Sequence, residues 1–142
     1  MNEMAEALFR EGVRHFDEGR LEEAARCFER AARLGHPDGQ GAFAWCLVNG
    51  DGVEKDETAG VEWAQKAADQ GDCVGRSLLG TCHFYGKGGL RVDKKRAAFL
   101  WLQAARQGER ASEYQLEAQH SLGLCFLHGE GVNQSDTRAV HW

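Results

Sequence analysis

The chain has 142 residues and a formal net charge of −5, with 42% hydrophobic and 27% charged residues. This composition is typical of a folded domain rather than a disordered segment. The negative charge, and the alternation of basic with acidic residues, argue against the basic stripe of a nucleic-acid-binding protein. No stretch reaches the ~20 apolar residues that a membrane span needs. We therefore expect neither a nucleic acid nor a membrane as partner.

The compartment is predicted from the start of the chain and from its cysteines. The first residues, MNEMAEALFREG, contain acidic side chains and lack the apolar core of a signal peptide. Five cysteines, an odd number without such a signal, indicate a reducing compartment. The sequence thus predicts a cytoplasmic protein.

Two kinds of segment recur along the chain. A small-residue segment returns at intervals of 36 and 37 residues, as AARLG at 31–35, AADQG at 67–71 and AARQG at 104–108. A glycine-rich segment returns beside it, as NGDGV at 49–53, YGKGG at 85–89 and HGEGV at 128–132. Because both markers keep one register, the sequence predicts a repeat architecture.

Each repeat is predicted to be a pair of helices. Residues 3–35 form the first unit, with a short turn at Gly19. Residues 36–71 form the second, whose second helix starts at Asp56 and ends at Gly71. Asp is a good N-cap, and Gly commonly follows the last turn of a helix. Residues 72–108 form the third unit, in which Asp93 and Gly108 take the same positions.

Residues 109–142 are predicted to form a fourth unit. It begins with the insert ERASEY at 109–114, a second candidate contact region that could equally be an idle loop or a longer helix start. The chain stops at Trp142, about two turns into the second helix of this unit. Because terminal repeats of solenoids need a polar cap, we expect a fragment of a longer protein. Its uncapped end could associate with a second copy.

The glycine loops could bind a phosphate or could connect helices. A phosphate-binding glycine loop follows a strand and precedes a helix, with further fixed residues. Here each loop lies between two predicted helices. Glycine in such a connector supplies a positive φ at the end of the first helix. The pattern therefore favours a structural connector.

The whole chain resembles the Sel-1-like repeat, a longer relative of the tetratricopeptide repeat. The resemblance rests on a small residue, an aromatic residue, a GxGV loop, an Asp and an AAxxG segment, which the second unit shows most fully. In the second unit these are Ala44, Gly50, Gly52, Val53, Asp56, Trp63, Ala67, Ala68 and Gly71. The first unit, with Gly12 and Ala24-x3-Phe28, is closer to a plain tetratricopeptide repeat. The resemblance implies an all-α fold, a right-handed α-α superhelix or solenoid.

In such solenoids the first helix of each pair lines a concave face that binds partners. Carried over by position, the resemblance implies a mostly apolar groove for an amphipathic helix or an extended peptide. The alternative is that much of this stripe is ordinary core between repeats. The predicted partner-binding residues are Phe9, Val13, Trp45, Val48, Asn49, Ser77, Thr81, Phe84, Tyr85, His120, Leu124 and His128.

No pattern of a catalytic or metal site is present, since CxxC, HExxH and GxSxG do not occur. We therefore expect no catalytic residue, no metal and no cofactor. The cysteines that repeat with the units, Cys46, Cys82 and Cys125, are predicted to be small buried hydrophobes rather than disulfides. The function predicted is a non-enzymatic scaffold or adaptor that binds other proteins or peptides. The alternative is a regulatory or adaptor arm of a larger enzyme complex or multidomain protein.

Overall fold

The structure is a computed structural model that describes residues 3–106. Within this range the chain is helical and contains no strand. The helices are α1 (Glu3–Asp17), α2 (Leu21–Arg33), α3 (Pro37–Asn49), α4 (Glu57–Asp69), α5 (Cys73–Tyr85) and α6 (Lys94–Arg106). The fourth predicted unit, with the insert at 109–114, lies outside the described residues.

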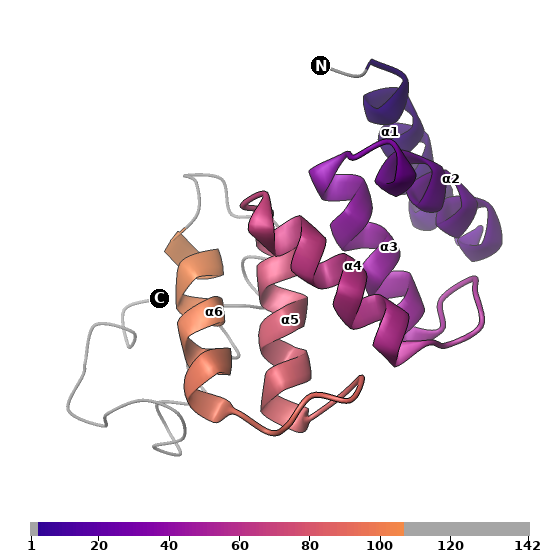
Figure 1. Cartoon of the computed structure of the whole chain (residues 1–142). Helices are drawn as coiled ribbons and strands as arrows, with labels where there is room; N and C mark the ends of the chain where they lie inside the picture. Colours follow the sequence, from indigo (N-terminus) through magenta and orange to yellow (C-terminus); the bar gives the residue numbers. More distant parts are fainter. Residues whose placement is uncertain (1–2, 107–142) are drawn as a thin grey trace.

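The described helices form hairpins that stack side by side along the chain (Figure 1). Helix α1 packs on α2, α3 on α4, and α5 on α6. Consecutive hairpins are joined by the contacts of α2 with α3, α4 with α5, and α3 with α5. Each hairpin thus packs mainly on its neighbours in the chain, as in solenoid proteins. The prediction of an all-α solenoid of helix pairs is confirmed.

Aspartates cap the helices where the sequence predicts it. The Ala59 N–H donates to Oδ1 of Asp56 (3.1 Å), and the Arg96 N–H donates to Oδ1 of Asp93 (3.0 Å). Each such cap stabilises its helix by about 1 kcal/mol. Gly71, just past α4, has a φ of +85°. The predicted N-cap of α4 is confirmed, whereas its C-cap is Gln70, one residue before the predicted glycine.

The repeated glycine loops are connectors that also contact the preceding hairpin. Gly50 and Gly86 end α3 and α5 in the left-handed conformation, with φ of +73° and +69°. A second glycine in each loop, Gly52 or Gly88, also has a positive φ. A Cβ at Gly52 would clash with the backbone of Leu21, at the start of α2. The second glycine thus lets the loop pack closely against the previous unit.

The small residues of the repeat lie where the two helices of a hairpin cross. A Cβ at Gly12 would lie 2.6 Å from the ring of Phe28, and a Cβ at Gly80 would lie 2.7 Å from Trp101. In the second hairpin the first helix carries Ala44 instead, and the glycine lies opposite it as Gly60 on α4. Close backbone approach is therefore kept in each described hairpin, although the glycine changes helix.

The core lies between the hairpins and is rich in alanine. Cys46 and Cys82 are both buried, and they lie in successive parts of this core. No disulfide forms among the cysteines of residues 3–106. The prediction that these two cysteines are buried hydrophobes is confirmed, while Cys125 lies outside the described residues. None of the helices in residues 3–106 is long and apolar enough to cross a membrane.

Candidate partner-binding groove

A groove of about 320 Å³ opens between the first helices of successive hairpins. Helices α1, α3 and α5 provide most of its lining, which is mainly apolar. We call it the concave groove. Its lining residues are Phe9, Val13, Phe16, Asp17, Phe28, Asp38, Ala42, Asp72, Cys73 and Val74.

The apolar wall of the groove comes from α1. Phe9, Val13 and Phe16 recur at intervals of four and three residues, which places them on one face of a helix. Phe28 of α2 lies behind them, with its ring centroid 5.9 Å from that of Phe9. Val13 is 37% exposed, so its side chain is accessible to a bound molecule.

A histidine between the first two hairpins holds this wall in place. The ring of His36 stacks on Phe9, with centroids 5.1 Å apart. Its Nδ1 accepts a hydrogen bond from the Gly39 N–H at the start of α3 (3.0 Å). Nε2 therefore carries the proton that it donates to Glu6 on α1 (2.6 Å). This bond lowers the pKa of Glu6 below its ordinary value.

The opposite wall carries carboxyl groups at the starts of α3 and α5. Asp72 is the N-cap of α5: its Oδ2 accepts from the Gly75 N–H at 2.9 Å. Its side chain also shares a hydrogen bond with Asp38. Asp72 is only 6% exposed, and burial together with Asp38 raises the pKa of Asp72 to about 8. At neutral pH the Asp72 carboxyl therefore mostly retains its proton.

The predicted binding residues fall into four groups, of which the last, Val48 and Ser77, is buried. Phe9 and Val13 line the concave groove. Trp45, Asn49, Thr81, Phe84 and Tyr85 lie on α3 and α5 but outside the lining of this groove. A third group, His120, Leu124 and His128, lies outside the described residues.

For two further residues, Val48 and Ser77, the prediction of partner binding is corrected, because both are buried. Val48 is 2% exposed and belongs to the core around α3, α4 and α5. Ser77 is 6% exposed, and its carbonyl accepts hydrogen bonds from Trp101 Nε1 (3.1 Å) and Thr81 Oγ1 (3.2 Å). Because both residues are buried, neither side chain is available to a partner. At these two positions the alternative interpretation, that the stripe is core between repeats, applies.

Among the predicted residues on α3 and α5 that lie outside the groove, Phe84 and Trp45 also pack against neighbouring side chains. Phe84 packs on Trp101, with ring centroids 5.4 Å apart, and on Tyr85 at 4.9 Å. Trp45 is partly buried against the core around Val48. Tyr85, in contrast, is 63% exposed. Of these aromatic side chains Tyr85 is the one that solvent reaches most freely.

The sequence-based interpretation missed Asp38, Asp72 and Val74. It placed the groove along the middle and the C-terminal end of each first helix. In the structure the C-terminal half of α1 faces the N-terminal ends of α3 and α5. The sequence does contain a signal for the acidic part of the lining: an aspartate recurs at the beginning of successive first helices, in HPDG and GDCVG.

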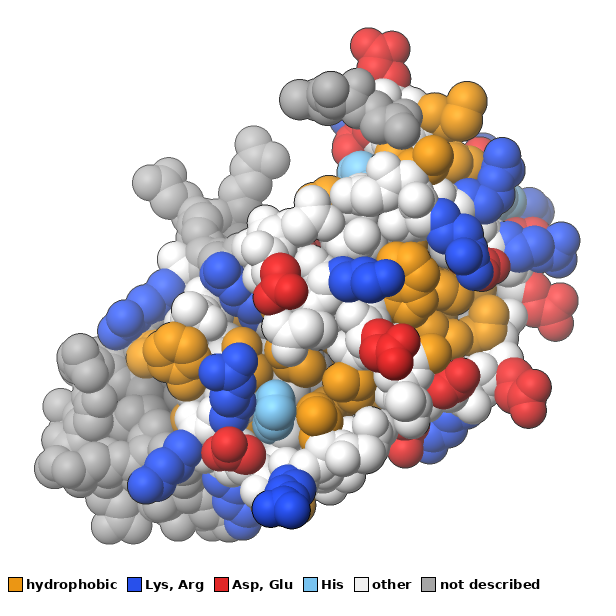
Figure 2. Space-filling view, viewed as in Figure 1, with side chains coloured by type: hydrophobic (Ala, Val, Ile, Leu, Met, Phe, Trp, Pro, Cys, Tyr) orange, Lys and Arg blue, Asp and Glu red, His pale blue; other side chains and the backbone are white. Residues whose placement is uncertain are grey.

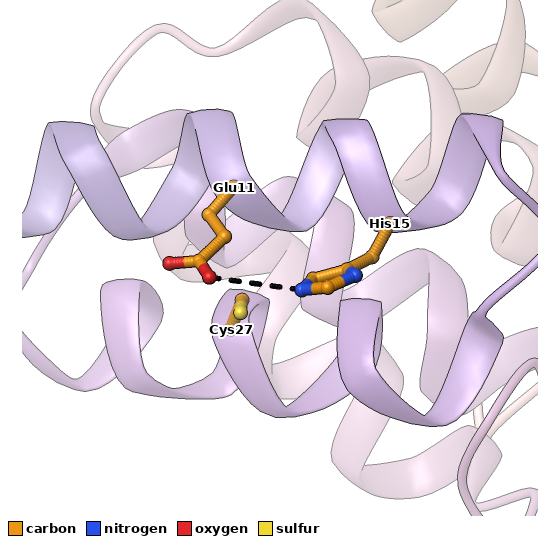
Figure 3. A group of neighbouring side chains, drawn as sticks. All are labelled: Glu11, His15 and Cys27. Carbon is orange, nitrogen blue, oxygen red and sulfur yellow. Dashed lines mark ion pairs between the residues drawn. The ribbon is translucent and has the colours of Figure 1, made fainter.

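One group of possible metal ligands occurs among the described residues, on α1 and α2 (Figure 3). The ligand atoms of Glu11, His15 and Cys27 lie within 4.8 Å of one another, and Nε2 of His15 is 3.7 Å from Glu11. A metal-bound histidine almost always hydrogen-bonds through its other ring nitrogen, but Nδ1 of His15 is buried without a partner. Burial and Glu11 also raise the pKa of the Cys27 thiol. The group therefore lacks two features of a resident metal site: a hydrogen bond to the second nitrogen of the histidine, and a thiol with a low pKa.

The charges on the surface are mixed. Figure 2 shows acidic and basic side chains scattered over one face, with hydrophobic side chains between them. Such a face offers no continuous basic stripe to a nucleic acid.

Known proteins resemble this chain along nearly its whole length. A regulator of exopolysaccharide production from Rhizobium leguminosarum, named as a negative regulator, is 30% identical over 95% of this chain and 53% of its own length. The chitin synthase regulator SKT5 of Saccharomyces cerevisiae is 32% identical over 84% of this chain and 16% of its own length. The chain thus spans about half of the first relative and a small part of the second.

Solved structures show the same architecture. A Sel1 repeat protein from Oxalobacter formigenes superimposes with a TM-score of 0.79 at 25% identity, covering 97% of this chain and 54% of that one. A protective antigen of uropathogenic Escherichia coli, described as displaying an SLR fold, gives a TM-score of 0.76 at 30% identity. The match covers 97% of this chain and 29% of the antigen.

The family model of the Sel1 repeat matches the chain in four successive segments, at residues 1–36, 39–72, 75–109 and 116–142. The first match includes the unit whose pattern is closer to a tetratricopeptide repeat. Together with the stacked hairpins and their glycine connectors, these matches show that the chain belongs to the Sel1 repeat family.

Proposed function

We propose that the chain is an interaction module that binds a segment of a partner protein in the concave groove. The observation that carries this proposal is the accessible apolar wall of α1 facing the starts of α3 and α5. A groove of this size accommodates one or two large side chains of a bound peptide. The chain would act by bringing proteins together, without chemistry of its own.

The names of the relatives support a regulatory role. The proteins from Rhizobium leguminosarum and Saccharomyces cerevisiae are both named as regulators. The yeast protein is named as a regulator of an enzyme, which favours a second candidate function: a regulatory arm of an enzyme complex. A partner that is itself an enzyme, or an enzyme subunit, would distinguish this function from that of a general adaptor.

A longer partner would extend beyond the concave groove. Trp45, Asn49, Thr81, Phe84 and Tyr85 continue along the first helices and are proposed as the surface that such a partner reaches. Because Trp45 and Phe84 also pack against the core, their truncation would disturb folding as well as binding. Tyr85→Ala is the better test of this extension, since its ring is mostly exposed.

The experiment is a selection of displayed random peptides, about twelve residues long, against the full chain. Affinities of the selected peptides are then measured for the wild type, Val13→Gln and Val92→Gln. Val92 is a matched control because it is also an exposed valine, 60% accessible, and does not line the groove. Circular dichroism confirms that each variant is folded.

We expect Val13→Gln to weaken binding roughly tenfold, because it places a polar group against the apolar contact of the peptide. Val92→Gln should leave the affinity unchanged. Peptides that bind both variants as well as the wild type would show that the groove is not the binding site.

A further inference from the structure

The concave groove has an uneven distribution of charge. Its lining contains three carboxyl groups, those of Asp17, Asp38 and Asp72, and among the described residues no Lys, Arg or His lines it. Asp17 and Asp38 are exposed at its edge, whereas Asp72 is buried beneath. The apolar side chains of α1 line the same groove.

This distribution selects among possible occupants. An acidic segment would bring like charges against the exposed carboxylates of Asp17 and Asp38, which is unfavourable. A wholly apolar segment would cover Asp17 and Asp38 without compensating their charge, at a cost in desolvation. A segment with a large apolar side chain and a neighbouring cation would satisfy both walls at once.

We propose that the occupant of the concave groove is a basic-hydrophobic peptide segment. Its aliphatic or aromatic side chain packs on Phe9, Val13 and Phe16. Its Lys or Arg side chain reaches the carboxyl groups of Asp38 and Asp17. This proposal rests on the proposed function, because it assumes that the groove binds a peptide.

The Asp38 carboxyl on the far wall is suited to receive the cation, because Asp72 beneath it helps to hold it in position. Asp38 and Asp72 share a hydrogen bond, and Asp72 is fixed in position by the backbone N–H of Gly75. A Cβ at Gly41 would clash with the carboxylate oxygen of Asp72, so the absence of a side chain at position 41 makes room for this group. The acidic wall is therefore held in place before any ligand arrives, which reduces the entropic cost of binding.

The test uses the peptides selected on the full chain, of which the tightest binder that depends on Val13 is synthesised in two forms. One form keeps its Lys or Arg, and the other replaces that residue by Gln. Both forms are titrated against wild type, Asp38→Asn, Asp17→Asn and the control Asp69→Asn. Asp69 is an exposed aspartate on α4 that hydrogen-bonds to Gln65 and does not line the groove.

We expect the selected peptides to be enriched in Lys or Arg beside a large apolar residue. The Lys or Arg form should bind wild type roughly tenfold more tightly than the Gln form. Asp38→Asn should remove much of that difference and Asp17→Asn part of it, whereas Asp69→Asn should leave it intact. Binding of the basic peptide should also weaken as salt is raised, because charge attraction is screened.

Two other outcomes are distinguishable. Neutral or acidic peptides that still depend on Val13 would overturn this inference and leave the proposed function standing. The same applies to a basic peptide whose preference over the Gln form is unchanged by the Asp38 and Asp17 variants. If no selected peptide depends on Val13, the proposed function fails, and this inference fails with it.

Discussion

At the scale of single residues, Asp72 combines two roles that oppose each other. As the N-cap of α5 it stabilises the helix, and its burial beside Asp38 disfavours the charged form. The second effect makes the stability of the fold depend on pH. Because the pKa is raised from 3.8 to about 8, the folded state keeps a proton that the unfolded state loses above about pH 4.

The sign of this dependence follows from the number of bound protons. Between about pH 4 and pH 8 the folded chain binds more protons at Asp72 than the unfolded chain. Its contribution to the free energy of unfolding therefore falls as pH rises through this window. The slope is at most roughly 1.4 kcal/mol per pH unit.

We predict that Asp72→Asn flattens this part of the pH profile. Asn is an equally good N-cap and cannot ionise, so the variant should gain stability relative to wild type between pH 4 and pH 8. Urea unfolding at several pH values measures the difference. The control is Asp56→Asn, the same change at an exposed N-cap. If wild type and Asp72→Asn show the same pH dependence, Asp72 ionises normally in the folded state.

At the scale of elements, the connector between α5 and α6 contains three glycines with different surroundings. Gly86, Gly88 and Gly89 all have a positive φ, which is strained for other residues. A Cβ at Gly88 would also clash with Val61 and with the carbonyl of Glu57 on α4. A Cβ at Gly89 would meet nothing within 4 Å. Substitutions at Gly88 and Gly89 therefore distinguish the effect of backbone strain, which both share, from the effect of close packing, which only Gly88 has.

We predict that Gly88→Ala destabilises the chain more than Gly89→Ala. The second variant should lose about 1 kcal/mol from the left-handed conformation alone. The first should lose at least about 1 kcal/mol more, because the loop must move away from α4. Thermal or chemical unfolding of the two variants tests this. Equal losses would mean that the connector does not depend on contact with the preceding hairpin.

At the scale of the whole molecule, the two buried cysteines report on how the hairpins open. Cys46 lies in the second hairpin and Cys82 in the third, and both are almost completely buried. Burial raises the pKa of Cys46 to about 12 and that of Cys82 to about 11. Since the thiolate is the reactive form, neither group should react in the closed structure.

We predict that iodoacetamide at neutral pH modifies Cys27 and Cys73 well before Cys46 and Cys82. The first two are only partly buried. Peptide mass spectrometry over time identifies which thiol is modified. Labelling of Cys46 and Cys82 should rise together with urea near the unfolding midpoint if the hairpins unfold as one unit. Rapid modification of either residue in the absence of urea would contradict the packing of the core.

The sequence alone determined the repeat, the helix pairs and most of their limits, because these depend on local chemistry. Asp56 and Asp93 cap helices through bonds to residues three positions away, and Gly50 ends α3 through its own φ. The period that relates these signals can be read without knowing which residues touch. Burial of Cys46 and Cys82 followed from the same period.

Only the tertiary structure decided which first-helix residues face the groove. Stacking of the hairpins sets the C-terminal half of α1 opposite the starts of α3 and α5, so that Asp38 and Asp72 join the lining. The same stacking buries Val48 and Ser77, although the equivalent positions of the first unit, Phe16 and Phe9, line the groove. Equivalent positions in a repeat share a place on their helix. Their exposure depends on the rotation and spacing between neighbouring hairpins, and these arise from contacts that no single unit contains.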